Sequence, residues 1–181
     1  LDGVYNDRYM EIVKRYEDRW PRGERAIDHF AAAMSALIWE TRETQSDVLG
    51  TLYEAHITCG EHGQFFTPEH VSALMAHMME ADGENVSDPS CGSGTMLIEA
   101  AKVNPNRTLY GKDLDQRCAN MCALNMWLFD CDAVVDWGDT LAGNTWMRWE
   151  IRKGGFMWET EPKQTQERRH GPEQGALPWA A

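Results

Sequence analysis

The sequence predicts an α/β fold in which a helical N-terminal section precedes a partial parallel sheet. Apolar residues recur at helical spacing along residues 8–19 and 24–43. From residue 85 onward, short apolar runs that end near an Asp alternate with helical segments, which is the β-α-β-α-β rhythm of a parallel sheet. The chain has 181 residues, a length that suits one domain of ordinary size.

Residues 1–62 are expected to form the helical N-terminal section. Ser46 is a favourable N-cap for a third helix, which is expected to end near Cys59. A further helix is expected to start at Thr67, because Thr is a good N-cap and Pro68 suits the first helical position.

Residues 63–160 are expected to form the α/β core. The expected strands are 85–88, 107–113 and 132–137, and the expected helices are 95–102 and 116–129. Residues 146–152 and 156–159 are typical of a hairpin around a Gly-Gly turn. With so few strands the sheet would be incomplete, and the polar tail 161–181 is expected to be flexible.

The distribution of charge limits the function classes. The net charge is −12, and residues 47–100 contain nine Asp or Glu but no Lys or Arg. A protein that grips DNA by itself normally neutralises several phosphates with a basic patch, so this segment is not a stand-alone DNA grip. A role on nucleic acid would need another surface or a partner. The alternative is an acidic surface that only keeps the protein soluble or suits a salty cytoplasm.

The cysteines and the hydropathy indicate a reducing, non-membrane setting. Five cysteines are an odd number within segments of regular structure, which predicts free thiols rather than disulfides and no metal site. Cys91 lies near an expected helix N-terminus, where a lowered pKa is expected. No apolar run approaches the roughly 20 residues of a membrane span and no secretory leader is visible, so a cytoplasmic location is expected.

The residues that carry chemistry lie at three successive strand ends. Asp88-Pro89-Ser90-Cys91-Gly92-Ser93-Gly94 joins a strand to a helix whose free N–H groups favour an anionic group. Asp113 ends the next strand, where an acid can accept the two hydroxyls of a ribose. Asp139 ends the third strand. Three acids around one glycine turn predict a pocket for a nucleoside-bearing ligand. NAD is disfavoured because Gly94 is followed by Thr95-Met96-Leu97, which breaks G-x-G-x-x-G.

Several stretches resemble the N6-adenine DNA methyltransferases, and among them the modification subunit of type I restriction-modification systems. Gly63-Gln64-Phe65-Phe66-Thr67-Pro68 is similar to the family's G-[EQ]-[FY]-[FY]-T-P element, and the turn after Asp88 is similar to its D-P-x-[CA]-G-[ST]-[GA] element. Further matching stretches in the family's order are Asp47-Val48-Leu49-Gly50-Thr51-Leu52-Tyr53-Glu54, Leu109-Tyr110-Gly111-Lys112-Asp113, Asn125-Met126-Trp127-Leu128 and Gly138-Asp139-Thr140-Leu141.

The resemblance covers roughly residues 47–141 and implies a Rossmann-like methyltransferase core that binds S-adenosyl-L-methionine. It implies adenine-N6 methylation of DNA, reached through or together with another subunit or domain. The residues that would bind the cofactor are Gln64, Phe65, Phe66, Thr67, Pro68, Asp88, Ser90, Gly92, Ser93, Gly94, Thr95, Asp113 and Asp139. Asp88 and the turn would face its amino-acid end, Asp113 its ribose and Asp139 its adenine.

The family's catalytic tetrapeptide [DNS]-P-P-[YFW] does not occur in this sequence. Three explanations remain: a fragment of a longer enzyme, a short homologue that has lost catalysis, or an unfamiliar base-holding set such as Trp146, Trp149 and Trp158. The alternative function is therefore binding of S-adenosylmethionine or of a protein partner without methyl transfer. Such a partner would meet the N-terminal helices or the Trp-rich hairpin at 146–158. A small-molecule methyltransferase is a weaker third possibility.

Overall fold

The computed structural model describes residues 10–16, 21–58, 66–79 and 85–160. The chain forms two compact units, Leu1–Gln45 and Ser46–Ala181. The predicted boundary between residues 62 and 63 and the predicted tail at 161–181 lie outside the described residues, and both stay predictions.

The first unit is helical, as predicted. Residues 10–15 form a short helix, and α2 extends over Ala26–Thr44. Helix α2 ends at Gln45, which adopts a left-handed conformation with φ 53° and donates its backbone N–H to the carbonyl of Thr41. Neither α2 nor any other helix in the described part of the chain has the length and apolarity that a bilayer crossing requires.

The second unit is built on a five-stranded sheet with strand order β1-β2-β3-β4-β5. β1 (Asn85–Asp88), β2 (Thr108–Asp113) and β3 (Asp132–Asp139) are parallel, so their carboxyl ends meet at one edge. β4 (Asn144–Arg152) and β5 (Phe156–Thr160) follow as an antiparallel hairpin. The α/β class, the three predicted strands and the hairpin are thereby confirmed.

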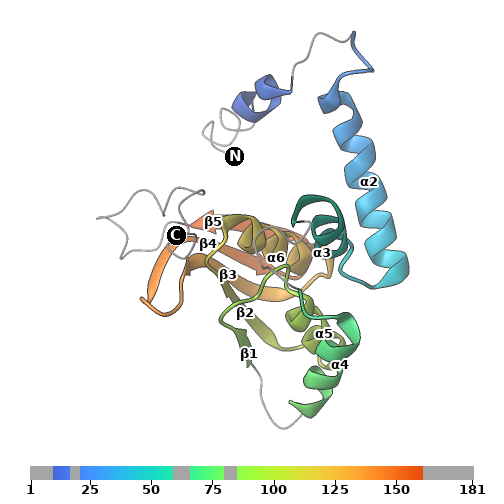
Figure 1. Ribbon diagram of the computed structural model, residues 1–181. Helices are drawn as coiled ribbons and strands as arrows, with labels where there is room; N and C mark the ends of the chain where they lie inside the picture. Colours follow the sequence, from blue (N-terminus) through green and yellow to red (C-terminus); the bar gives the residue numbers. More distant parts are fainter. Residues whose placement is uncertain (1–9, 17–20, 59–65, 80–84, 161–181) are drawn as a thin grey trace. The chain divides into compact units, whose positions relative to one another are not determined.

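Two crossover helices join the parallel strands. α5 (Thr95–Val103) connects β1 to β2, and α6 (Gln116–Leu128) connects β2 to β3 (Figure 1). Both pack on the sheet, and the core lies between them and the strands. Its fully buried members include Leu97, Ile98, Leu109, Met126, Val135 and Ile151. This core fixes the positions of the strand ends.

Two further helices lie before the sheet. α3 (Val48–Tyr53) continues directly into a π-helix at Glu54–Thr58, and α4 (Glu69–Met78) packs against α5. Their starts differ from the expectation by one residue. Asp47 caps α3 in place of Ser46, because the Asp47 carboxylate accepts the N–H of Gly50. Helix α4 begins after Pro68, whose ψ of 140° is extended rather than helical.

Candidate functional site

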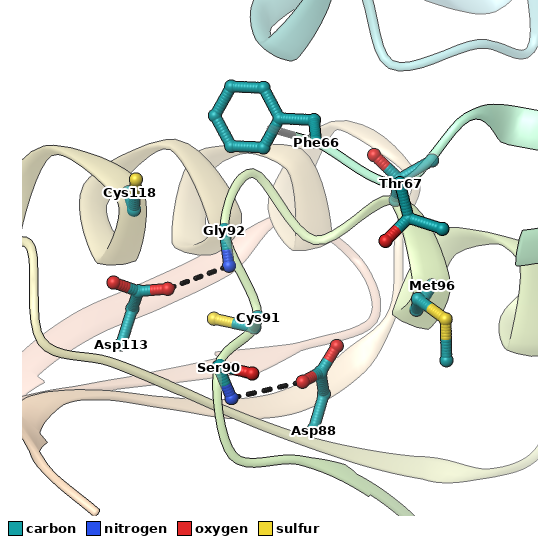
Figure 2. Close-up of a pocket in the computed structure, with 10 residues that line it drawn as sticks. Phe66, Thr67, Asp88, Ser90, Cys91, Gly92, Met96, Asp113 and Cys118 are labelled. Atoms are coloured by element: carbon teal, nitrogen blue, oxygen red, sulfur yellow. Dashed lines mark hydrogen bonds between the residues drawn. The ribbon is translucent and has the colours of Figure 1, made fainter. Parts of the chain in front are cut away.

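A cavity of about 380 Å³ opens at the carboxyl ends of β1 and β2 (Figure 2). This volume is within the usual range for small-molecule sites. Its lining residues come from the segment before α4, the turn after β1, the start of α5, the end of β2 and the start of α6. They are Phe66, Thr67, Asp88, Ser90, Cys91, Gly92, Thr95, Met96, Asp113 and Cys118.

Asp88 begins the turn that follows β1. Its carboxylate accepts the backbone N–H of Ser90 at 3.0 Å, which bends the chain sharply at the end of the strand. Burial raises the pKa of this carboxyl group, and the hydrogen bond from Ser90 opposes the rise. The cavity therefore has an acidic group with a raised pKa on one side of the turn.

Asp113 faces the same turn from the end of β2. One carboxylate oxygen accepts the N–H of Gly92 at 2.8 Å, and the other accepts the N–H of Asp115 at 2.8 Å. Burial raises the pKa of Asp113, and the negative charges of Asp115 and Asp88 raise it further. Each carboxylate oxygen has a second lone pair, so Asp113 retains acceptor capacity toward a ligand.

The residues between Asp88 and α5 form a tightly packed loop, which we call the glycine turn (residues 89–94). Gly92 has a φ of +54°, and a Cβ at this position would lie 2.9 Å from the ring of Phe66. Phe66 in turn packs against Tyr53, with ring centroids 5.9 Å apart. A glycine is needed at 92 both for the backbone conformation and for the aromatic ring above it.

The glycine turn ends at the amino terminus of α5. Gly94 is the N-cap residue, with a φ of +94° and no side chain capping the helix. A Cβ on Gly94 would lie 2.9 Å from the sulfur of Cys122. The first turn of α5 thus points its backbone N–H groups toward the cavity end of the helix, where an anionic group is favoured.

The structure brings most of the predicted site residues together. Seven of them line the cavity: Phe66, Thr67, Asp88, Ser90, Gly92, Thr95 and Asp113. The side chain of Ser93 is buried on the side of the turn that faces away from the cavity. Neither Gly94 nor Pro68 lines the cavity. Gln64 and Phe65 lie outside the described residues.

Asp139 does not line the cavity. Its carboxylate accepts the backbone N–H of Ala142 at 3.0 Å, within its own turn. The neighbouring Thr140 donates its hydroxyl to the carbonyl of Pro89 at 2.7 Å, so the end of β3 supports the glycine turn from outside. The predicted contact between Asp139 and an adenine ring stays a prediction.

Sequence reasoning missed the residues that hold the glycine turn from behind. Asp47 accepts hydrogen bonds from Ser93, Thr95 and Asn125, although 78 residues separate Asp47 from Asn125. The available signal was Asn125 itself, an amide on the buried face of an amphipathic helix, where a polar group needs a partner. Cys91, Met96 and Cys118 were not predicted as cavity-lining residues either.

The expected lowering of the pKa of Cys91 is wrong. A hydrogen bond with Cys122 and burial raise its pKa well above the usual value for a thiol. Proximity to the helix N-terminus is outweighed by this hydrogen bond, by burial and by the nearby negative charges of Asp113 and Asp88. Cys91, Cys118, Cys122 and Cys131 are free and buried, and Cys59 lies outside the described residues.

The Trp-rich hairpin does not gather its aromatic residues into one site. Trp149 is buried in the core, whereas Trp158 pairs with Glu150 in the register and is therefore on the opposite face of the sheet. Trp146 packs edge-on against Trp137, with centroids 5.0 Å apart. None of the three hairpin tryptophans lines the cavity.

The sequence profile of the N-6 DNA Methylase family matches residues 44–158, which include the glycine turn and both carboxylates of the cavity. The chain belongs to the N-6 DNA methylase family. Membership in a methylase family implies a methyl-donor cofactor.

The relatives of this member of the N-6 DNA methylase family include subunits of restriction enzymes. The type I restriction enzyme MjaVIII methylase subunit of Methanocaldococcus jannaschii is 40% identical over 111 residues, covering 55% of this chain and 19% of the relative. The type I restriction enzyme MpnII methylase subunit of Mycoplasma pneumoniae is 26% identical, covering 80% of this chain and 30% of the relative. The type II restriction enzyme and methyltransferase RM.BcgI of Heyndrickxia coagulans is 28% identical, covering 56% and 19%. The chain thus spans less than a third of these relatives' length, and no solved structure matches it.

Proposed function

We propose that this chain forms the cofactor-binding part of an N6-adenine DNA methyltransferase, of the kind found as the modification subunit of type I restriction-modification systems. We further propose that its cavity binds S-adenosyl-L-methionine. The observation that carries the proposal is the pairing of Asp113 with Gly92 beside the start of α5. This arrangement offers a carboxylate acceptor for ribose hydroxyls next to helix N–H groups that favour a carboxylate.

The charge of the cavity residues suits this cofactor. Asp88 and Asp113 are both acidic and partly desolvated, which suits a ligand with a sulfonium and an ammonium group. Phe66 offers an aromatic ring above the turn, in reach of a cation or an adenine. Thr67 adds a hydroxyl at the same wall.

When bound, the cofactor would supply an electrophilic methyl group for transfer to the exocyclic amine of adenine, with S-adenosylhomocysteine and a proton as the other products. The described residues would bind and orient the cofactor and shield it from water. DNA and the other subunits of a type I assembly are proposed as partners, in keeping with the names of the relatives. Because segment 47–100 is acidic and has no Lys or Arg, DNA would be bound by another surface of the protein or by a partner subunit.

The first test is a calorimetric titration of the purified chain with S-adenosylmethionine. We expect saturable binding at one site per chain, and at least a tenfold weaker affinity for Asp88→Ala, because this variant removes a cavity carboxylate and opens the bend at Ser90. NAD serves as the comparison ligand and is expected not to bind. A folded protein without affinity for S-adenosylmethionine would contradict the proposal.

A second candidate function is cofactor or partner binding without methyl transfer by this chain alone. The observation that favours it is the lack of a [DNS]-P-P-[YFW] tetrapeptide in the sequence. The two candidates separate in an assay that incubates the cofactor-loaded chain with adenine-unmethylated plasmid DNA and measures N6-methyladenine by mass spectrometry. Methylation by the chain alone would exclude the second candidate, whereas binding without methylation would support it.

A further inference from the structure

The carboxylate of Asp47 lies behind the glycine turn and joins three segments of the chain. Asp47 is buried at the N-cap of α3. One of its oxygens accepts the N–H of Gly50 and the side-chain amide of Asn125, each at 2.7 Å. The other accepts the hydroxyls of Ser93 and Thr95, the latter at 2.8 Å. A single carboxylate therefore connects α3, the start of α5 and the last turn of α6.

All four of these donors are uncharged. The negative charge of Asp47 is thus stabilised by the geometry of the donors rather than by a cation among them. A buried charge that loses a hydrogen bond is strongly disfavoured, because no water replaces the missing donor. The positions of Ser93 and Thr95 are consequently restricted to those that keep both hydroxyls on this carboxylate.

The packing around this carboxylate leaves little freedom. A Cβ at Gly50 would lie 2.5 Å from the hydroxyl oxygen of Ser93 and 2.8 Å from the carboxyl carbon of Asp47. Asn125 also donates to the backbone carbonyl of Ser93 at 2.8 Å. Ser93 is 1% exposed, so its side chain faces this cluster and not the cavity.

The glycine turn is therefore held from two sides. Asp113 holds the N–H of Gly92 from the cavity, and Asp47 holds the next residues from behind. The backbone between these two carboxylates forms the floor of the cavity and leads into α5. Because Asp47 does not line the cavity, its effect on a ligand passes through this backbone and through Thr95, whose side chain donates to Asp47 and which itself lines the cavity.

We propose that Asp47 is a positioning residue for the methyl-donor site: it sets the glycine turn and the first turn of α5 in the conformation that binds the cofactor. The inference rests on the proposed function of the cavity. It assigns α3, which contributes nothing to the cavity lining, an indirect part in cofactor binding.

The test compares two substitutions at one position by calorimetric titration with S-adenosylmethionine. Asp47→Ala removes all four acceptor contacts and is expected to weaken binding at least tenfold. Asp47→Asn keeps the shape, and its amide can donate to the hydroxyls of Ser93 and Thr95 while its oxygen still accepts from Gly50 and Asn125. Binding by Asp47→Asn is therefore expected to stay within about threefold of the unmodified chain.

A matched control separates positioning from general destabilisation. Ile151 is fully buried in β4, away from the cavity, and Ile151→Val or Ile151→Ala is chosen to match the fall in melting temperature of Asp47→Ala. The control is expected to keep its affinity. Equal weakening in the control and in Asp47→Ala would overturn the proposal. If Asp47→Ala does not fold, Ser93→Ala replaces it, since it removes one of the four contacts from outside the cavity lining.

A measurement without ligand distinguishes failure of this inference from failure of the proposed function. Amide hydrogen exchange of residues 92–95 is expected to rise at least tenfold in Asp47→Ala, while exchange in β2 and β3 stays unchanged. If the unmodified chain does not bind S-adenosylmethionine but this local rise occurs, the proposed ligand is wrong and the positioning of the turn by Asp47 stands. Unchanged exchange at residues 92–95 would overturn the role of Asp47 whatever the ligand.

Discussion

The turns that follow β1 and β3 begin alike but are held by different interactions. In each, an Asp at the strand end accepts a backbone N–H of its own turn, and a glycine with positive φ follows four residues later, at Gly92 and Gly143. The first turn is clamped by Asp113 and Asp47 and lies under Phe66. At Gly143 an added Cβ would meet no atom within 4 Å. Two turns with the same Asp and Gly spacing thus differ in that only the one enclosed by remote residues lines the cavity.

The largest effect is expected at Asp113, which both holds the glycine turn and lines the cavity. Asp113→Ala removes the acceptor of the Gly92 N–H and the proposed acceptor of the ribose. We expect S-adenosylmethionine binding to weaken by about tenfold to a hundredfold, as for the loss of a charged hydrogen bond. Calorimetric titration measures this change. An unchanged affinity would remove Asp113 from the cofactor site.

Paired glycine substitutions test the comparison directly. Gly92→Ala and Gly143→Ala both place a side chain at positive φ, at a cost of roughly 1–3 kcal/mol in the free energy of unfolding. Only Gly92→Ala would also push against Phe66. We therefore expect denaturant unfolding to show a loss in both variants, whereas titration with S-adenosylmethionine shows severalfold weaker binding in Gly92→Ala alone. If Gly92→Ala bound S-adenosylmethionine as tightly as Gly143→Ala does, the ring of Phe66 would have to move aside without affecting the cofactor site.

The pH dependence of stability should reflect the desolvation of the two strand-end carboxyl groups that line the cavity. Burial raises the pKa of Asp88 and of Asp113 above the ordinary value of 3.8, so the folded state binds these protons more tightly than the unfolded state does. Their contribution to stability is therefore complete below pH 3.8 and is lost as the pH rises through the raised values. In urea unfolding, Asp113→Asn is expected to lose less stability than the unmodified chain over this range.

The affinity for the cofactor should move in the opposite direction with pH. A cationic ligand favours the ionised carboxylates, so binding is expected to strengthen as the pH rises above 3.8 and to level off once both groups are ionised. Titrations at several pH values give the measurement. A pH-independent affinity would contradict a contact between these carboxylates and the charged groups of the ligand.

The smallest effect is expected at Asp139. Among the described hydrogen bonds, its carboxylate accepts only the backbone N–H of Ala142, and Asp139 does not line the cavity. Asp139→Ala is therefore expected to change the affinity for S-adenosylmethionine by less than about twofold, with a stability loss of about 1 kcal/mol at most for one exposed hydrogen bond. A tenfold loss of affinity would instead support the predicted contact between Asp139 and adenine.

Much of this architecture could be predicted because it depends on local patterns. Alternation of apolar runs with helical spacing located β1, β2, β3 and both crossover helices to within a residue or two. The Gly-Gly pair located the hairpin. The starts of α3 and α4 were predicted one residue away because several adjacent residues are acceptable caps, and tertiary contacts choose among them.

The sequence by itself determined the strand and helix order, the parallel arrangement of β1, β2 and β3, and hence the meeting of Asp88, Asp113 and the glycine turn at one edge of the sheet. Those features follow from periodicity and from the geometry of β-α-β connections. Only the tertiary structure decided that Asp139 caps its own turn, that Ser93 faces away from the cavity, and that Asp47 and Asn125 meet behind it. The physical reason is that a buried polar group must find its partners across the whole chain, and the distance in sequence between those partners leaves no local pattern.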